Sequence, residues 1–513
     1  MTRLRLAVAI FLSMATLLLV FHGHRVVTTN DEGILLDSAQ RVAEGSRPYV
    51  DFWAYMSPGS YWLQAAVFRV GGVSLFTGRV IVILDFALQC ALVFWITARL
   101  SSLATGFAVC FAFVGFQIAE PAFLTAQHQW DSSALALAGV AIATSASTRL
   151  RWVASGALLA AATWCTPTAG LVGIAIAAWL LIDRERRRGL IPFLAGIAAV
   201  SSIAAGALVM TGSLIPFLRQ MIWLKDNYAV VNAMPYGSII GGYRALFAGT
   251  AGLAETITRI VLVGCVALPA ILPVVATMAW GIALWRKRVP PELRGIALLL
   301  VLCNIAFVMA LAPRQDVMHL AFAAALSYAL AGAAMERWVP ARANVALATV
   351  GLIMAGIFGS NFFRTLKDTS SVATPVGDVR IENAKVPAMR ELLASVHPGQ
   401  GLFVYPYMPI HYFLTQGKNP TEFSFFSPAM GTKREETAAL AELQARPPEW
   451  ILYMKLTREE FLRVCPRGAD LDWRHELLED WIEKNFRPLE AASDPVLGGY
   501  QLWYRVTEQA RSR

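Results

Sequence analysis

The sequence predicts a mainly α-helical, polytopic membrane protein with a small C-terminal α/β domain. Of its 513 residues, 56% are hydrophobic and only 15% are charged, whereas soluble domains are about one quarter charged. The apolar residues form runs long enough to cross a bilayer, and the composition changes near residue 370. The net charge of +9 does not indicate nucleic-acid binding, because Lys and Arg cluster at the ends of the apolar runs.

About eleven apolar runs are the predicted spans, since a transmembrane helix needs about 20 mostly apolar residues. The first run follows Arg3 and Arg5, and no small-residue cleavage site comes after it, so we interpret it as a retained signal anchor. The predicted transmembrane domain covers residues 1–369. Its runs lie near residues 6–22, 79–98, 102–119, 131–148, 151–165, 168–182, 189–211, 257–285, 294–312, 319–335 and 343–361.

The short loops predict the orientation of the chain. If the N-terminus is cytoplasmic, the basic clusters 183–188, 286–288 and 337–342 all fall on the cytoplasmic side, while the opposite short loops carry only Arg314. This distribution satisfies the positive-inside rule. We therefore expect an inner-membrane protein whose C-terminus and long loops 23–78 and 212–256 face the periplasm.

Residues 370–513 are expected to form a soluble periplasmic domain. Asp, Glu, Pro and Lys become frequent again, and the apolar pattern alternates between helix and strand periods. The predicted elements are helix 387–396, strand 401–405, strand 450–454, helix 474–485 and strand 500–506.

The first outer loop contains two adjacent acids, Asp31 and Glu32. Apolar residues between Ile34 and Ala43 share one helical face, and Gly45 closes the helix. One interpretation is purely structural: Thr29 as N-cap and Glu32 three residues later form a capping box. The other is chemical, because paired carboxylates can divide the roles of base and orienting group.

The next segment of the loop favours the chemical interpretation. It reads Pro48-Tyr-Val-Asp51-Phe-Trp-Ala-Tyr55-Met-Ser-Pro58-Gly-Ser-Tyr61 and places a further carboxylate among aromatic residues. Aromatic residues alone are weak evidence, since they are common at any membrane interface. A second acidic position in the same loop is stronger evidence for a site.

Three motifs resemble the GT-C superfamily of membrane glycosyltransferases. Asp31-Glu32 with the Pro48 to Tyr61 segment is similar to the first loop of these enzymes, and Arg314-Gln-Asp316-Val-Met-His319 to their R-x-D-x-x-H box. Gly417-Lys-Asn-Pro-Thr421 looks like their "nPT" turn. The nearest groups are the dolichyl-phosphate-mannose protein mannosyltransferases and the lipopolysaccharide galacturonosyl- and aminoarabinose-type transferases. The likeness covers nearly the whole chain, in order.

The sequence also departs from this family pattern. Many relatives have a Lys or His before the Pro box of the first loop, where this chain has Met56-Ser57. A frequent Lys at the outer end of a middle span is replaced by Cys165-Thr-Pro167. Donor phosphate recognition is therefore expected to rest on other residues.

The resemblance implies transfer of a sugar from a polyprenyl-phosphate donor to a cell-envelope acceptor (a glycolipid, a glycan or a protein), with inversion. Asp31 is the expected base, because the acceptor hydroxyl needs proton removal, and Glu32 or Asp51 would orient base or acceptor. The substrate-binding residues would be Tyr55, Tyr61, Arg314, Asp316 and His319, the cationic ones stabilising phosphate charge. The structural alternatives are a surface ion pair for Arg314 and Asp316, and a polar helix start for His319.

The remaining polar residues give weaker signals. Loop 212–256 combines aromatic, basic and acidic residues, which suits either a lid over a sugar site or an interfacial belt. Glu120, His128 and Asp131 lack the compact spacing of metal ligands, so we predict no metal site and no cofactor. The alternative function is a transporter or flippase of a lipid-linked glycan. Transporters usually place ionisable residues inside their spans, where Asp85 is the clearest example here.

Overall fold

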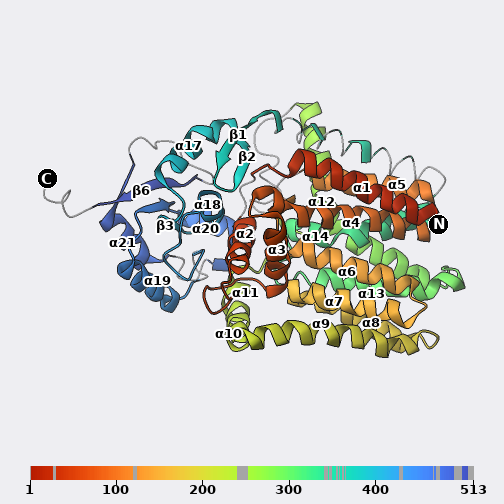
Figure 1. The fold of residues 1–513 in the computed structure, drawn as a ribbon. Helices are drawn as coiled ribbons and strands as arrows, with labels where there is room; N and C mark the ends of the chain where they lie inside the picture. Colours follow the sequence, from red (N-terminus) through yellow and green to blue (C-terminus); the bar gives the residue numbers. More distant parts are fainter. Residues whose placement is uncertain are drawn as a thin grey trace.

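The computed structural model describes residues 2–26, 30–119, 124–239, 252–339, 366–426, 431–465, 467–468, 474–489 and 499–506, with scattered helical positions between 345 and 363. A bundle of long helices occupies one end of the molecule and a smaller mixed domain the other (Figure 1). Two short helices of the first outer loop, α2 and α3, lie between them. The mainly α fold class and the small C-terminal sheet are both confirmed.

Helices occupy the first ten predicted spans. The run 319–335 is a pair of helices, α14 and α15, bent by 74°, and the run 343–361 lies largely outside the described residues. The bundle helices are α1 (Thr2–His22), α4 (Leu75–Leu100), α5 (Leu103–Ala119), α6 (His128–Ser145), α7 (Arg149–Cys165), α8 (Gly170–Ile182), α9 (Leu190–Met210), α12 (Leu253–Trp285), α13 (Pro291–Met309), α14 (Val317–Ala323) and α15 (Ala325–Trp338).

Among the described residues, five helices are long and apolar enough to cross a membrane, or six if the bent pair counts as one span. Two further apolar segments, 103–115 and 167–182, are shorter. The chain is thus a multi-pass membrane protein, whereas the total of about eleven spans and the orientation stay predictions.

The predicted outer loops contain helices of their own. The first carries α2 (Asn30–Ala43) and α3 (Pro58–Gly71). The second continues from α10 (Leu214–Trp223) through a π-helical turn (Leu224–Tyr228) into α11 (Ala229–Val231). Residues 240–251 lie outside the described residues.

The C-terminal region begins with a hairpin next to the predicted boundary at 369/370. Strands β1 (Thr369–Thr374) and β2 (Gly377–Glu382) are antiparallel, and a separate four-stranded sheet has the order β3-β4-β6-β5. In it β3 and β4 are parallel, while the other pairs are antiparallel. The remaining elements are α17 (Val386–Ser395), β3 (Leu402–Tyr405), α18 (Ile410–Thr415), α19 (Lys433–Ala445), β4 (Trp450–Tyr453), α20 (Arg458–Val464), α21 (Glu476–Asn485), β5 (Phe486–Pro488) and β6 (Gln501–Arg505).

The first outer loop and the C-terminal domain share one hydrophobic core. Leu35 of α2 and Phe68 of α3 are buried in the same cluster as Ile410 and Phe413 of α18. Phe68 and Phe413 stack with ring centroids 5.9 Å apart. The C-terminal domain is therefore packed against the first loop, and its position relative to the bundle is set by α2 and α3.

Candidate active site

Asp31 and Glu32 open α2 and point in different directions. Successive helical residues are about 100° apart around the axis, so neighbouring acids cannot share one environment. The Glu32 side chain is fully buried, whereas Asp31 is half-buried. Thr29, the proposed N-cap, lies outside the described residues.

Glu32 is enclosed by an ion-pair network. Arg79 at the start of α4 donates to both carboxylate oxygens of Glu32, from Nη2 at 2.7 Å and from Nε. The amide of Ala126 donates to the same carboxylate at 3.1 Å, and Arg79 also contacts His22. Neither Arg79 nor Glu32 exposes any of its side chain. Glu32 therefore joins α1, α2 and α4, so it can orient the neighbouring Asp31 through this network, whereas a fully buried side chain does not orient the acceptor by contact.

Asp31 faces a different set of groups. Its charge interacts with His128 on α6, Tyr228 on the π-helical turn and Arg314 of the R-x-D-x-x-H box. Within the described residues no hydrogen bond to its carboxylate is seen. Burial, reinforced by the nearby Asp31 carboxylate, raises the pKa of Tyr228 to about 12, so Tyr228 is a neutral hydroxyl at physiological pH.

The R-x-D-x-x-H box forms one hydrogen-bonded unit. Arg314 donates from Nε to Asp316 at 2.8 Å, and His319 Nδ1 lies 3.0 Å from both Asp316 carboxylate oxygens. Asp316 also caps α14 by accepting from the His319 amide at 3.0 Å. The Asp316 side chain is 2% exposed, so this is a buried ion pair rather than the surface pair of the structural alternative.

Arg314 and His319 keep the Asp316 carboxyl group ionised. Burial alone would raise the pKa of Asp316, but hydrogen bonds and charge from His319 and Arg314 outweigh burial and hold that pKa well below its ordinary value. The side chains of Arg314 and His319 remain 15% and 19% exposed. One carboxylate therefore orients both Arg314 and His319, while part of each side chain stays accessible.

A neighbouring chain segment fixes the position of Arg314. The Met234 amide donates to the Pro313 carbonyl at 3.0 Å, and the Val317 amide to the Ser238 carbonyl at 2.9 Å. Asn232, just after α11, accepts from Arg314 Nη1 at 2.8 Å. Asn232 and Arg79 could not be recognised from the sequence, because their partners are 82 and 47 positions away. Tyr228 lies in loop 212–256, and the mixed composition of that loop was the one feature of the sequence that indicated a site there.

Asp51 and Tyr61 occupy structural positions. Asp51 lies in an exposed turn and accepts from Arg47 through its amide at 2.7 Å, Nε at 3.1 Å and Nη2 at 2.8 Å. These hydrogen bonds lower the pKa of Asp51. Tyr61 is 0% exposed and contacts the Met56 amide through its hydroxyl. The predictions that Asp51 is catalytic and that Tyr61 contacts substrate therefore do not fit, because neither is placed with Asp31.

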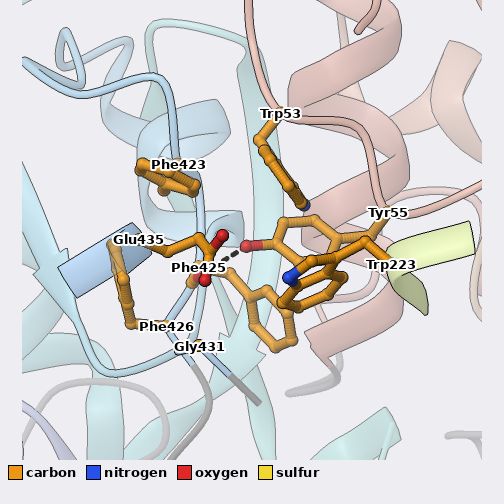
Figure 2. Close-up of a pocket in the computed structure, with 8 residues that line it drawn as sticks. All are labelled: Trp53, Tyr55, Trp223, Phe423, Phe425, Phe426, Gly431 and Glu435. Carbon is orange, nitrogen blue, oxygen red and sulfur yellow. Dashed lines mark hydrogen bonds between the residues drawn. The ribbon is translucent and has the colours of Figure 1, made fainter. Parts of the chain in front are cut away.

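Tyr55 contacts the C-terminal domain instead of the box around Arg314. Its hydroxyl donates to the Phe425 carbonyl at 2.7 Å, and the two rings meet edge to face 4.5 Å apart. Burial raises the pKa of Tyr55 well above its ordinary value. Tyr55 lines an aromatic pocket between the first loop, α10 and the C-terminal domain (Figure 2). Its predicted substrate contact would therefore be in this second place.

The "nPT" turn is only partly at the surface. Lys418 is exposed, whereas Thr421 is 4% exposed and its hydroxyl donates to the Phe423 carbonyl at 2.9 Å. The beginning of the turn is thus at the surface and its end is buried. Thr421 leads directly into the aromatic residues that line the pocket.

The described residues contain no group of three or more His, Cys, Asp or Glu side chains arranged to hold a metal ion. Glu120, one of the acids considered in the sequence analysis, lies outside them. His128 donates or accepts through Nδ1 with the Thr166 hydroxyl at 2.7 Å. His128 is thus engaged with a protein hydroxyl.

Comparison with known proteins defines the fold class. No protein-family model matches the sequence, and no curated protein matches it either. The structure is similar to that of ArnT from Cupriavidus metallidurans bound to undecaprenyl phosphate, with a TM-score of 0.59, 12% identity and 98% of each chain covered.

The fold is also similar to an oligosaccharyltransferase of Archaeoglobus fulgidus in complex with Zn and sulfate. Here the TM-score is 0.50 with 11% identity, over 88% of this chain and 67% of that one. The same TM-score of 0.50 is found for AglB from this organism with an inhibitory peptide and a dolichol-phosphate. The chain therefore has the GT-C fold.

Proposed function

We propose that this protein is a glycosyltransferase that moves a sugar from a polyprenyl-phosphate-linked donor to a cell-envelope acceptor. The observation that carries the proposal is the position of Asp31, a half-buried carboxylate that interacts with Arg314 at the mouth of the bundle. A free carboxylate next to fixed cations suits proton removal from a hydroxyl beside a departing phosphate. The GT-C fold supports the same class, because ArnT was seen with undecaprenyl phosphate and AglB with a dolichol-phosphate.

The proposed reaction is a single displacement. Asp31 accepts the proton of the acceptor hydroxyl, and the hydroxyl oxygen bonds to the anomeric carbon of the donor sugar. The bond from that carbon to the phosphate oxygen breaks, and its electron pair leaves with the polyprenyl phosphate. Attack opposite the leaving group inverts the anomeric configuration.

Arg314 and His319 would bind the departing phosphate. The hydrogen bonds of Arg314 in the described chain use Nε and Nη1, so Nη2 is the nitrogen left for a ligand. His319 is held through Nδ1, which leaves Nε2. Donors fixed in advance stabilise charge that develops during the reaction without reorganising. These two side chains would take the place of the Lys or His that many relatives have before the Pro box of the first loop.

The remaining parts of the proposal concern location and partners. The positive-inside pattern supports a site on the periplasmic face of a bacterial inner membrane. The donor would be a polyprenyl-phosphate hexose or pentose, and the acceptor a glycolipid, a glycan or a protein.

One observation favours transport of a lipid-linked glycan as the alternative. Asp85 on α4 and Asp131 on α6 lie near each other inside the bundle, and ionisable residues within spans often belong to transport paths. Transport would move the donor across a vesicle membrane without cleaving its sugar–phosphate bond.

A consumption assay separates the two functions. Purified protein is incubated with a radiolabelled prenyl-phosphate sugar and an envelope glycolipid extract, and free prenyl phosphate is measured. The proposal expects acceptor-dependent release that falls at least tenfold in Arg314→Ala. Flipping of intact donor in proteoliposomes, with no release in any extract, would overturn it.

A further inference from the structure

Helix α10 follows directly on a membrane-spanning helix. The segment Arg187–Met210, which contains α9, is among the described helices long and apolar enough to cross a bilayer. It ends in a sharp turn, because Gly212 has a φ of +69° and the Ser213 amide donates to the Leu208 carbonyl at 2.8 Å. A helix of this length already crosses the hydrocarbon layer, which is about 30 Å thick. The chain therefore leaves the hydrocarbon layer where α10 begins, on the side of the C-terminal domain (Figure 1).

One face of α10 packs on the first outer loop. Gln220 accepts from the Ala54 amide at 3.0 Å and donates to the Tyr49 carbonyl at 3.4 Å. The ring of Phe217 meets the ring of Tyr49 edge to face, with centroids 5.1 Å apart. This face is therefore covered by protein, and its contacts fix how α10 is rotated about its own axis.

The opposite face of α10 is apolar and exposed. Ile215, Leu218 and Ile222 form one stripe, because residues three, four and seven positions apart share a helix face. Their exposed fractions are 55%, 47% and 61%. Just before this stripe, Val209 and Met210 at the end of α9 are 60% and 84% exposed. The apolar surface of the span is thus followed by a second apolar surface on α10, which is stable against lipid and costly in water.

A basic residue borders this stripe. Arg219 is exposed and lies one helical turn from both Ile215 and Ile222. An arginine beside an apolar helix face can extend its guanidinium to lipid phosphates while its stem stays in apolar surroundings. An apolar stripe with a basic flank is typical of a helix that lies in the interface of a bilayer.

We propose that α10 lies in the lipid interface of the leaflet on the C-terminal-domain side, with Ile215, Leu218 and Ile222 among the acyl chains. The face of Gln220 then points away from the lipid, toward the first outer loop. Arg219 reaches the level of the phosphate groups. The occupant of the stripe is therefore membrane lipid, and a second protein chain is not needed to cover it.

In this position α10 sets the depth of the candidate active site in the membrane, an inference that rests on the proposed glycosyltransferase function. The helical backbone continues from α10 into the π-helical turn. At the end of that turn, Tyr228 interacts with both Asp31 and Arg314. The proposed base and the proposed phosphate ligand are thus held near the lipid phosphates, where the phosphate of a membrane-bound polyprenyl donor lies.

Spin labels test the position of α10 without any substrate. The full-length protein carries one nitroxide at a time, attached through a ketone-bearing unnatural amino acid so that the native cysteines stay unchanged. It is placed in nanodiscs of phosphatidylcholine and phosphatidylglycerol. Collisions of each label with oxygen, which concentrates in lipid, are compared with those of a water-soluble nickel chelate. The labels replace Ile215, Leu218 and Ile222, with Ile203 of α9 (74% exposed) as lipid reference and Leu477 of α21 (38% exposed) as aqueous reference.

Oxygen collisions are expected to dominate at the three positions on α10, as at Ile203, and nickel collisions at Leu477. Nickel collisions that dominate on α10 would overturn the assignment, because the stripe would then face water. Low rates with both reagents would also overturn it, because a protein surface, such as a second copy of this chain, would then cover the stripe.

Transfer kinetics in the same nanodiscs test the depth-setting role. Leu218→Ser and Ile222→Ser should each raise KM for an undecaprenyl-phosphate-linked donor about three- to tenfold. KM for a short-chain citronellyl-phosphate donor, which arrives from water, should stay constant. Leu477→Ser is the matched control and should change neither KM.

The two measurements keep the proposals distinguishable. Oxygen-dominated labels on α10 without turnover of any donor would refute the transferase and leave α10 in the lipid interface. Normal turnover with an unchanged KM for the long-chain donor in both α10 variants would refute the depth-setting role and leave the transferase.

Discussion

Arg79 on α4 holds Glu32 at the start of α2 through both carboxylate oxygens, and neither side chain is exposed. This ion pair fixes the first turn of α2 against the bundle. Because Asp31 is the preceding residue on the same turn, its direction is fixed as well. The pair thus places the proposed base without taking part in the reaction.

Glu32→Gln is expected to destabilise the protein before it affects catalysis. Removing one partner of a buried pair leaves an uncompensated charge and costs about 3–5 kcal/mol. The measurement is thermal unfolding of purified protein in detergent. Replacing both residues by Leu should cost less than the sum of the single changes. A Glu32→Gln protein of normal stability that transfers sugar slowly would contradict this structural role.

Gly33→Val should loosen the C-terminal domain from the first loop. A Cβ atom at Gly33 would lie 2.1 Å from the Ile410 amide nitrogen, closer than any backbone contact permits. The expected result is faster proteolysis of residues 370–513 and loss of transfer activity. Gly206→Ala is the control, because a Cβ atom there meets nothing within 4 Å. Unchanged protection in Gly33→Val would contradict the packing of α2 on α18.

Asp316 should stabilise the protein at every physiological pH. Because its pKa is lowered on folding, its contribution is complete above the ordinary carboxyl pKa of about 4 and is lost only as the pH falls through the folded value. Asp316→Asn keeps a capping side chain but removes the charge facing Arg314 and His319. We expect Asp316→Asn to lose about 2 kcal/mol of stability above about pH 5, and this difference to shrink as the pH falls below about 4. A difference that does not shrink at acid pH would contradict it.

Local sequence patterns predicted much of the fold. Hydrophobic length located helices such as α4 and α13, and apolar runs located β3 and β4. The hairpin β1–β2 was missed because its residues are mostly polar, with Val372, Val379 and Ile381 among its few buried positions. The helices of 212–256 were hidden by a composition that also suits an interfacial loop.

The site was only partly predictable, because tertiary contacts decide which of the candidate residues come together. Asp31, Arg314, Asp316 and His319 are brought together as the motif order suggested. The different surroundings of Asp31 and Glu32 could not be predicted. Arg79, the partner of Glu32, begins an apolar run far along the chain. Asp51 and Tyr61 were chosen for residue type, yet local hydrogen bonds and core packing occupy them.

Topology provides a separate prediction. A reporter fused after Arg513 or within residues 212–256 should report a periplasmic location, and one at Arg186 a cytoplasmic one, because the short basic loops set orientation. Alkaline phosphatase and green fluorescent protein fusions measure this in complementary ways. A cytoplasmic signal after Arg513 would place the C-terminal domain on the wrong side for periplasmic transfer.

The rate of sugar transfer by Asp31→Asn tests the central proposal most directly. Loss of a general base typically lowers the rate about a hundred- to ten-thousand-fold, whereas damage at a helix start costs only about 1 kcal/mol of stability. The variant should therefore insert and unfold like the wild type but consume labelled prenyl-phosphate sugar at most at a hundredth of the wild-type rate. Asp51→Asn, in its exposed turn, should stay within a few-fold of wild type. Near-normal transfer by Asp31→Asn would show that Asp31 only begins a helix and would contradict its role as the base.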